Sequence, residues 1–351
     1  MNRIISLLGA VASLNATASP VFIDEPSEDR WFYPYNSTAG ERAQASTFSS
    51  LPQASDVDDR FGIFLIGFDT SAVIPAGLAP EKYRIRSLTF TAVIGQDDAF
   101  AYDPSYDSIA TYATPTTPES EMDSDSGRPL ELHGVGFRNS WTASSFDERS
   151  AHGSSSPGQR NAYPLGFDAG GLARDVSSNV SEGYEAIPWA IGQTDELEAG
   201  DLVPEETTFT FTIDTTLPGT ATYLQQGLAE GKLWFALSSL HPATQQGGEF
   251  VAWLTRDDAI HQLLGGLAPT LTLEVDYNIP LTLVRNGNSS SLSWPEFSGF
   301  THSLRASHTP GDWSAAPIHS HDAITDGIGG FTEVTTEKRR FYQLEILPST
   351  P

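Results

Sequence analysis

The strongest hydrophobic feature of the chain is the stretch R-F-G-I-F-L-I-G-F-D-T-S-A-V-I-P-A-G, which begins at Arg60. Nearly every residue from Phe61 to Phe68 is apolar or glycine, which indicates a strand with both faces covered. The next segment, Arg84 to Ile94, alternates between apolar and polar residues. This period-two pattern is typical of a half-buried strand. Together the two segments predict a core built from β-strands.

Most of the other periodic segments are short and also predict strands. They are Pro129–Val135, Thr208–Asp214, Leu233–Leu240, Phe250–Thr255, Thr270–Tyr277, Leu281–Arg285, Ser291–Trp294, Thr301–Ala306, Gly330–Thr335 and Arg340–Ile346. One helix is predicted, Ala221–Glu230, with Gly231 as its C-terminal cap. Strands and helices do not alternate as they do in a Rossmann or TIM-barrel fold, so we predict an all-β protein.

The spacing of these segments predicts two β-domains. Residues 95–200 are rich in Asp, Ser, Pro and Gly, which predicts long loops between short strands in the first domain. Asn278-Ile279-Pro280 is typical of a boundary, and the close spacing of the strands beyond it suits a small immunoglobulin- or fibronectin-like sandwich. The predicted domains are therefore residues 19–279 and residues 280–351.

The N-terminus predicts export. A short basic start is followed by the apolar stretch Ile4–Ala12, which is too short to span a bilayer, and then by the small-residue motif Ala16-Thr17-Ala18. We predict that residues 1–18 are a signal peptide and that the mature chain begins at Ser19. The expected location is extracellular, at the cell surface or in the periplasm, and no later segment is apolar enough to predict a membrane span.

The composition narrows the classes of partner. The chain carries 45 acidic and 19 basic side chains among 351 residues, for a formal net charge of -26. This charge repels phosphate backbones, so nucleic acid is not an expected partner. The chain has no cysteine, which excludes disulfides, a thiolate nucleophile and cysteine-ligated zinc.

Several motifs, in their order along the chain, resemble a known family. The first is F-G-I-F-L-I-G-F-D-T-S-A-V-I-P-A-G followed by Y-R-I-R-S-L-T-F-T. It is similar to R-x-L-L-R-F-D-L-S-x-L-P-A-G-A-x-I-x-S-A-x-L in secreted bacterial jelly-roll modules of the DNRLRE type. The later stretches T-F-T-I-D-T-T-L-P-G-T-A-T-Y-L-Q-Q-G-L-A-E-G-K-L-W-F-A-L and A-P-T-L-T-L-E-V-D-Y resemble the closing part of those modules. The resemblance covers roughly Trp31 to Tyr277.

This resemblance implies a jelly-roll β-sandwich with long loop insertions in residues 19–279. Its relatives include carbohydrate-binding modules, some of which hold structural calcium, so it also makes sugar binding plausible. The tail resembles a small β-module that is common at the end of such proteins, through L-S-W-P-E-F-S-G-F-T-H-S-L-R-A-S and R-R-F-Y-Q-L.

Four acidic residues predict a calcium site after the second strand. Asp97 and Asp98 follow the strand directly, and Asp103 and Asp107 lie in Y-D-P-S-Y-D shortly afterwards. Hard cations prefer several oxygen ligands on an adaptable loop, so we expect a structural Ca²⁺ held by these carboxylates. The later stretch D-S-D-S-G, residues 123–127, begins like a calcium-binding loop but lacks its distal glutamate.

Aromatic side chains in the loop-rich region predict a sugar-binding surface. Tyr102, Tyr106, Trp141 and Trp189 lie where rings can stack on the apolar faces of sugars, and Arg138 can donate to hydroxyl groups. For any one of these rings, a core position is the competing interpretation. The tryptophans in or beside strands, such as Trp234 and Trp253, are predicted to be core residues.

These observations predict an exported, non-catalytic protein that binds extracellular polysaccharide. Two alternatives remain open: a structural or adhesive protein of the cell surface or matrix without a small ligand, and a polysaccharide lyase or glycoside hydrolase. The chain has no G-x-S-x-G, H-E-x-x-H, P-loop or G-x-G-x-x-G motif. A lyase would draw on tyrosine, histidine and arginine, for which His133, Arg138, Arg160 and Tyr163 are candidates.

Overall fold

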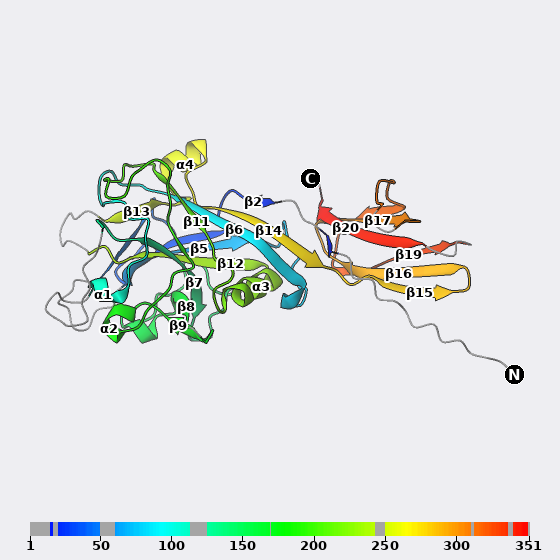
Figure 1. The fold of residues 1–351 in the computed structure, drawn as a ribbon, viewed down its shortest axis with the longest axis horizontal. Coiled ribbons are helices and arrows are strands. Elements are labelled where there is room, and N and C mark those ends of the chain that lie inside the picture. The colour runs from blue at the N-terminus through cyan, green and yellow to red at the C-terminus, as the bar shows by residue number, and fades with distance from the viewer. Residues whose placement is uncertain are drawn as a thin grey trace.

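The computed structural model describes residues 15–16, 20–49, 60–112, 125–168, 170–242, 250–309, 312–335 and 340–349. In these residues the protein is all-β, and every pairing between its strands is antiparallel. Figure 1 shows an elongated molecule with two large sheets at one end and two small sheets at the other. The predicted all-β sandwich fold is confirmed.

The first large sheet has five strands among the described residues. Their order is β1-β14-β6-β11, and β2 also pairs with β14. The strands are β1 (Asn15–Ala16), β2 (Val21–Ile23), β6 (Tyr83–Val93), β11 (Thr208–Thr212) and β14 (Thr270–Asn278).

The second large sheet has nine strands in the described part of the chain. Their order is β13-β4-β5-β12-β7-β8-β9, with β3 paired to β5 and β10 paired to β7. The strands are β3 (Glu28–Phe32), β4 (Gln44–Ser49), β5 (Arg60–Asp69), β7 (Leu130–Phe137), β8 (Ala162–Phe167), β9 (Ala173–Asp175), β10 (Ala190–Ile191), β12 (Lys232–Ser239) and β13 (Val251–Leu254).

The helices are short (Figure 1). They are α1 (Ile109–Tyr112), α2 (Asn179–Glu182), α3 (Thr220–Glu230) and α4 (Ala259–Leu264), with 3₁₀ turns η1 (Pro80–Lys82) and η2 (Pro157–Gln159). The longest of those described, α3, packs against β6 and β12. The helix predicted from the sequence is α3. It buries Leu224 and Leu228, and Gly231 ends it in the left-handed conformation with φ of 81°.

The main core lies between the two large sheets. Phe90 of β6 contacts Phe68 of β5 and Phe235 of β12, with ring centroids 6.1 and 5.8 Å apart. The other face of β5 is covered as well. On this outer side of the sheet, Ile63 and Leu65 belong to a second apolar cluster that also contains Phe146 and Trp234. This double coverage explains why β5 is the most continuous apolar run of the chain.

The two small sheets contain only residues of the tail. One has the order β15-β16-β19 and the other β18-β17-β20. The strands are β15 (Thr282–Asn286), β16 (Ser289–Glu296), β17 (Phe300–Ser307), β18 (His319–Asp322), β19 (Gly327–Val334) and β20 (Phe341–Pro348). Leu292, Trp294 and Leu304 form a separate core between these sheets. The tail also contacts the large unit, because Tyr277 donates a hydrogen bond to the carbonyl oxygen of Ile346 at 3.0 Å.

Three strands near the N-terminus were not predicted from the sequence. The segment from Ser19 to Ser55 has no clear periodicity, yet its described part contains β2, β3 and β4. β2 pairs with β14, whereas β3 and β4 both pair with β5. The predicted signal peptide lies outside the described residues except for β1, so export stays a prediction. Among the described residues, no helix has both the length and the hydrophobicity needed to cross a membrane.

Candidate functional site

Two of the aromatic residues predicted to bind sugar are buried in the main core. Tyr102 is 4% exposed and Trp189 is 2% exposed. The Tyr102 ring packs edge-on against Phe209 with centroids 5.7 Å apart. Neither ring is an open surface platform of the kind expected from the sequence, because both fill space between the sheets. Trp234 and Trp253 are core residues, as predicted.

Trp141 and Arg138 are engaged with other side chains of the loop region. The ring of Trp141 lies edge-on to Phe146 at 5.7 Å and covers the second apolar cluster. Arg138 donates to Asp175 at 2.7 Å, and its guanidinium lies 3.9 Å above the centre of the Tyr163 ring. The structure therefore does not gather the predicted sugar-binding residues into one site.

A different set of side chains forms a pocket of about 280 Å³ beside Trp189. We call it the aromatic pocket. It lies between the end of β8, the segment after α2 and the start of α3. The residues that line it are Phe167, Asp168, Arg174, Tyr184, Glu185, Ile187, Trp189, Leu217, Pro218 and Thr220. A pocket of this size is at the lower end of the range for small-ligand sites.

A glycine in β7 positions the indole of this pocket. A Cβ atom at Gly134 would lie 2.2 Å from the Trp189 ring, so only glycine lets the ring lie flat on the strand. On its other side Trp189 is parallel to Phe167, with centroids 6.1 Å apart and planes at 9°, and it meets Tyr223 edge-on at 5.0 Å. The ring is therefore fixed from three directions.

Two buried polar atoms of the pocket residues have no hydrogen-bond partner among the described residues. They are Nε1 of Trp189 and Oγ1 of Thr220. Thr220 is fully buried and Trp189 is nearly so. A buried donor without a partner costs roughly 1–3 kcal/mol, and a ligand oxygen in the pocket would remove that cost.

Arg174 supplies a cation at the same pocket. Its guanidinium lies 3.7 Å above the centre of the Tyr184 ring, and it makes no hydrogen bond or ion pair within the described ranges. Burial raises the pKa of Tyr184 to about 12, so this ring stays neutral. An uncommitted guanidinium is notable in a chain with 45 acids, because most arginines of the described residues pair with carboxylates.

Tyr106 lies beside the aromatic pocket, because it contacts Glu185, which is one of the residues that line it. Its hydroxyl donates to the Glu185 carboxylate, which also accepts from the backbone N–H of Ile109 at 3.2 Å. Burial and the charge of Glu185 both raise the pKa of Tyr106. Tyr106 is 40% exposed, and of the four predicted aromatic residues it is the one that lies both on the surface and beside the pocket wall.

Two of the four predicted calcium ligands come together, with a third carboxylate that was not among them. One ligand atom each from Asp103, Asp107 and Asp125 lies within 4.8 Å of the other two. We call this group the acidic cluster. Asp97 and Asp98 are exposed and do not belong to it; Asp97 instead accepts from the backbone N–H of Glu205 at 3.3 Å. The D-S-D-S-G stretch contributes Asp125, whereas its first aspartate lies outside the described residues.

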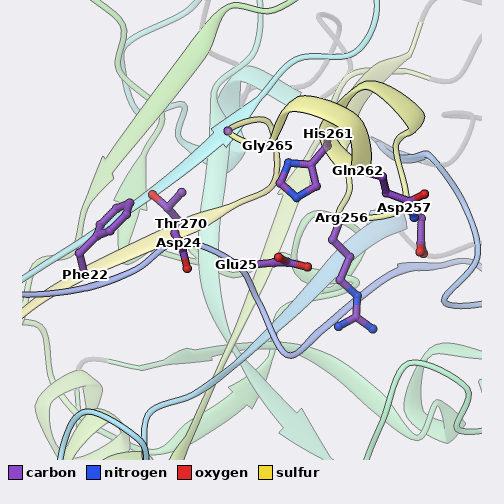
Figure 2. A pocket seen from close by; sticks show the side chains of 10 residues that line it. Phe22, Asp24, Glu25, Arg256, Asp257, His261, Gln262, Gly265 and Thr270 are labelled. Carbon is purple, nitrogen blue, oxygen red and sulfur yellow. The ribbon is translucent and has the colours of Figure 1, made fainter. Parts of the chain in front are cut away.

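A larger and more open pocket, of about 820 Å³, lies between β2 and α4. Figure 2 shows the side chains around it, with His261 from α4 and with Asp24 and Glu25 from the segment after β2. Nδ1 of His261 accepts from two backbone N–H groups, of Leu267 and Ala268, which places the ring proton on Nε2. This pocket is acidic and has one aromatic ring, so it does not suit stacking on sugars.

Two of the four residues considered for a lyase, His133 and Arg160, are buried. Glu131 pairs with Arg60 and lies 3.4 Å from His133, and all three side chains are at most 3% exposed. Burial alone would raise the pKa of Glu131, but the charge of Arg60 and the hydrogen bond from His133 hold it well below the usual range. Arg160 is also fully buried. This group stabilises the interior, and neither His133 nor Arg160 can reach a polymer in this structure.

Comparison with protein-family models finds no match, and neither does a search of curated proteins.

Most residues of the aromatic pocket were not predicted from the sequence. Phe167, Arg174, Tyr184 and Thr220 come from four separate segments, so no local pattern unites them. One signal was available: the glycine at position 134 interrupts a predicted strand, and glycine inside a strand often marks a close approach by another group.

Proposed function

We propose that the protein is an exported, non-catalytic β-sandwich protein that binds extracellular polysaccharide through the aromatic pocket. The observation that carries this proposal is the unpartnered indole N–H of Trp189 beside a small pocket that also contains aromatic rings. A sugar offers the matching groups, because it presents C–H faces to rings and hydroxyl oxygens to donors.

Each pocket residue has a role in this proposal. Phe167 and Tyr184 provide apolar contact area for one sugar unit. Trp189 and Thr220 donate hydrogen bonds to its hydroxyl oxygens, and Arg174 donates to hydroxyl or carboxylate oxygens at the outer side. The remaining units of the polymer lie outside the pocket, since about 280 Å³ leaves room only for a small group.

The test is binding of the mature chain to a panel of soluble glycans and insoluble polysaccharides, with calcium and with EDTA. We expect saturable binding to one class of polysaccharide. Arg174→Gln removes the charged donor and should weaken binding roughly 10- to 100-fold, since a hydrogen bond to a charged group contributes about 1.5–3 kcal/mol. Trp189→Phe keeps a ring in the core but removes the N–H, and should weaken binding about tenfold.

Tyr35→Ala provides the control, because Tyr35 is an aromatic side chain that is 73% exposed and does not line the pocket. It should bind as the wild type does. Binding that Arg174→Gln and Trp189→Phe leave unchanged would place the sugar elsewhere. No binding across the panel would reject the proposal.

The alternative of an adhesive or structural surface protein has one observation in its favour. Ile260, Leu263 and Leu264 of α4 are 52%, 80% and 77% exposed. Apolar side chains gathered on one short helix are typical of a protein contact. Replacing Leu263 and Leu264 by Ser would abolish such a contact and leave glycan binding intact, so the two functions can be separated.

A further inference from the structure

The acidic cluster is built from two segments that are held together by a glycine. Asp103 and Asp107 lie between β6 and α1, and Asp125 lies just before β7. A Cβ atom at Gly127 would lie 2.7 Å from the carbonyl oxygen of Ala101, and Gly127 has φ of +108°. Glycine at this position therefore permits the segment that carries Asp125 to lie against the segment that carries Asp103.

The cluster is more buried than an ordinary group of surface acids. Asp103 is 2% exposed and Asp107 is 6% exposed, whereas Asp125 is on the surface. Charged carboxylates this close together and removed from water repel one another unless a positive charge lies near them. Arg128 supplies one such charge, because it donates to Oδ2 of Asp107 at 2.8 Å.

One oxygen of Asp103 is both buried and without a hydrogen-bond donor. Oδ1 accepts from the backbone N–H and the hydroxyl of Ser105, at 2.8 and 2.9 Å. Oδ2 has no partner within the part of the chain that the structure describes. A buried carboxylate oxygen is costly to leave unpaired, so a cation bound at this atom would stabilise the cluster.

Ser105 contacts two carboxylates of the cluster. Its Oγ lies 2.9 Å from Oδ1 of Asp103 and 2.9 Å from Oδ2 of Asp125. A hydroxyl has a single proton and can donate to one of these oxygens at a time. Ser105 therefore holds the two carboxylates close together without compensating the charge of both.

We propose that the acidic cluster is a calcium site, with Asp103, Asp107 and Asp125 as its protein ligands. All three ligands are carboxylates, and the group contains no histidine, so the donor set suits a hard cation. Calcium accepts irregular arrangements of six to eight oxygens, with water completing the shell on the exposed Asp125 side. Arg128 and Tyr112 both donate to Oδ2 of Asp107 and hold that carboxylate in place from behind.

Calcium that binds the native state and not the unfolded state should stabilise the protein. With a dissociation constant of roughly 10⁻⁴–10⁻³ M, as in many extracellular modules, calcium at about 1 mM is expected to raise Tm by about 1–6 °C. EDTA should reverse the shift, and isothermal titration with calcium chloride should show the same saturation. Terbium offers a local readout, since Tyr112 is bonded to Asp107 at 3.1 Å and can sensitise its emission.

Two variants test the ligands, and one serves as a matched control. Asp103→Asn and Asp125→Asn each remove one charge from the cluster and should weaken calcium binding by at least about tenfold, with loss of the sensitised terbium emission. Asp98→Asn removes a charge from the same loop outside the cluster. Asp98 has φ of +51°, which asparagine tolerates, so this variant should keep both the fold and the wild-type response.

The two ligand variants test the calcium site separately. If Asp103→Asn does not fold, Asp125→Asn still tests whether the cluster binds calcium, because Asp125 is on the surface. A wild-type protein that shows no saturable calcium binding would overturn the proposal, and so would an Asp125→Asn variant that binds calcium with unchanged affinity. Neither result depends on a glycan, so this site and the proposed sugar binding can fail independently.

Discussion

The close contact between Gly134 and Trp189 makes a sharp prediction about the aromatic pocket. A Cβ atom added at position 134 would lie 2.2 Å from the indole, whereas ordinary contacts begin near 3.4 Å. In Gly134→Ala the ring therefore has to move by about 1 Å. Phe167 and Tyr223 pack against the same ring, so this movement disturbs the pocket wall.

The expected cost follows from two opposing terms. Overpacking a buried site typically costs about 1–3 kcal/mol, and replacing glycine inside a strand returns roughly 0.5–1 kcal/mol. The net destabilisation of Gly134→Ala should be about 1–2 kcal/mol. For a unit of this size each kcal/mol lowers Tm by about 2–4 °C, so the shift is measurable by calorimetry.

Gly158→Ala is the matched control, because a Cβ atom at Gly158 meets nothing within 4 Å. This variant should be as stable as the wild type or slightly more stable. In addition, Gly134→Ala should change the tryptophan fluorescence and weaken glycan binding, while Gly158→Ala should change neither. If the two variants have the same Tm, the close approach of the indole to β7 is wrong, and so is the pocket built on it.

Three further predictions concern stability. Glu131→Gln leaves the buried charge of Arg60 uncompensated and should destabilise the protein by roughly 3–5 kcal/mol in urea unfolding. Burial lowers the pKa of His241 from 6.5 to about 4, so between these values the unfolded chain binds a proton that the native chain does not. Stability should therefore fall as pH drops through this window, and His241→Gln should flatten the dependence measured at about pH 7 and about pH 5. Finally, a chain ending at Asn278 loses the hydrogen bond from Tyr277 and should melt at a lower temperature than the full chain, while limited proteolysis tests whether the tail folds by itself.

The strands that the sequence predicted are those whose burial shows in a local pattern. β5 is apolar almost throughout because both of its faces are covered. β6 alternates because one of its faces is more deeply buried than the other. β3 was missed because its residues E-D-R-W-F look like a surface segment, yet Asp29 and Arg30 are 1% and 3% exposed. Asp29 is buried because it accepts from the backbone N–H of Arg256 at 2.7 Å. A hydrogen bond to a residue so distant in the chain does not appear as a pattern among neighbouring residues.

The candidate sites show the same division between local and long-range information. Asp103 and Asp107 were predicted as ligands together with Asp97 and Asp98, because the four lie close together in the sequence. The cluster contains only the first two of these, and its third carboxylate, Asp125, comes from the segment that contains Gly127. Trp189 was selected as a surface ring because it lies in a polar, loop-rich region. Its burial depends on a glycine in a distant strand, which a pattern of neighbouring residues cannot show.

A short segment connects the acidic cluster to the aromatic pocket. Tyr106 lies between two residues of the cluster, and its hydroxyl donates to Glu185 in the pocket wall. The N–H of Ile109, at the start of α1, also donates to this carboxylate. A cation that fixes the segment would thus fix Glu185 as well. If both proposals hold, calcium raises the affinity for the glycan, and by linkage the glycan raises the affinity for calcium by the same factor.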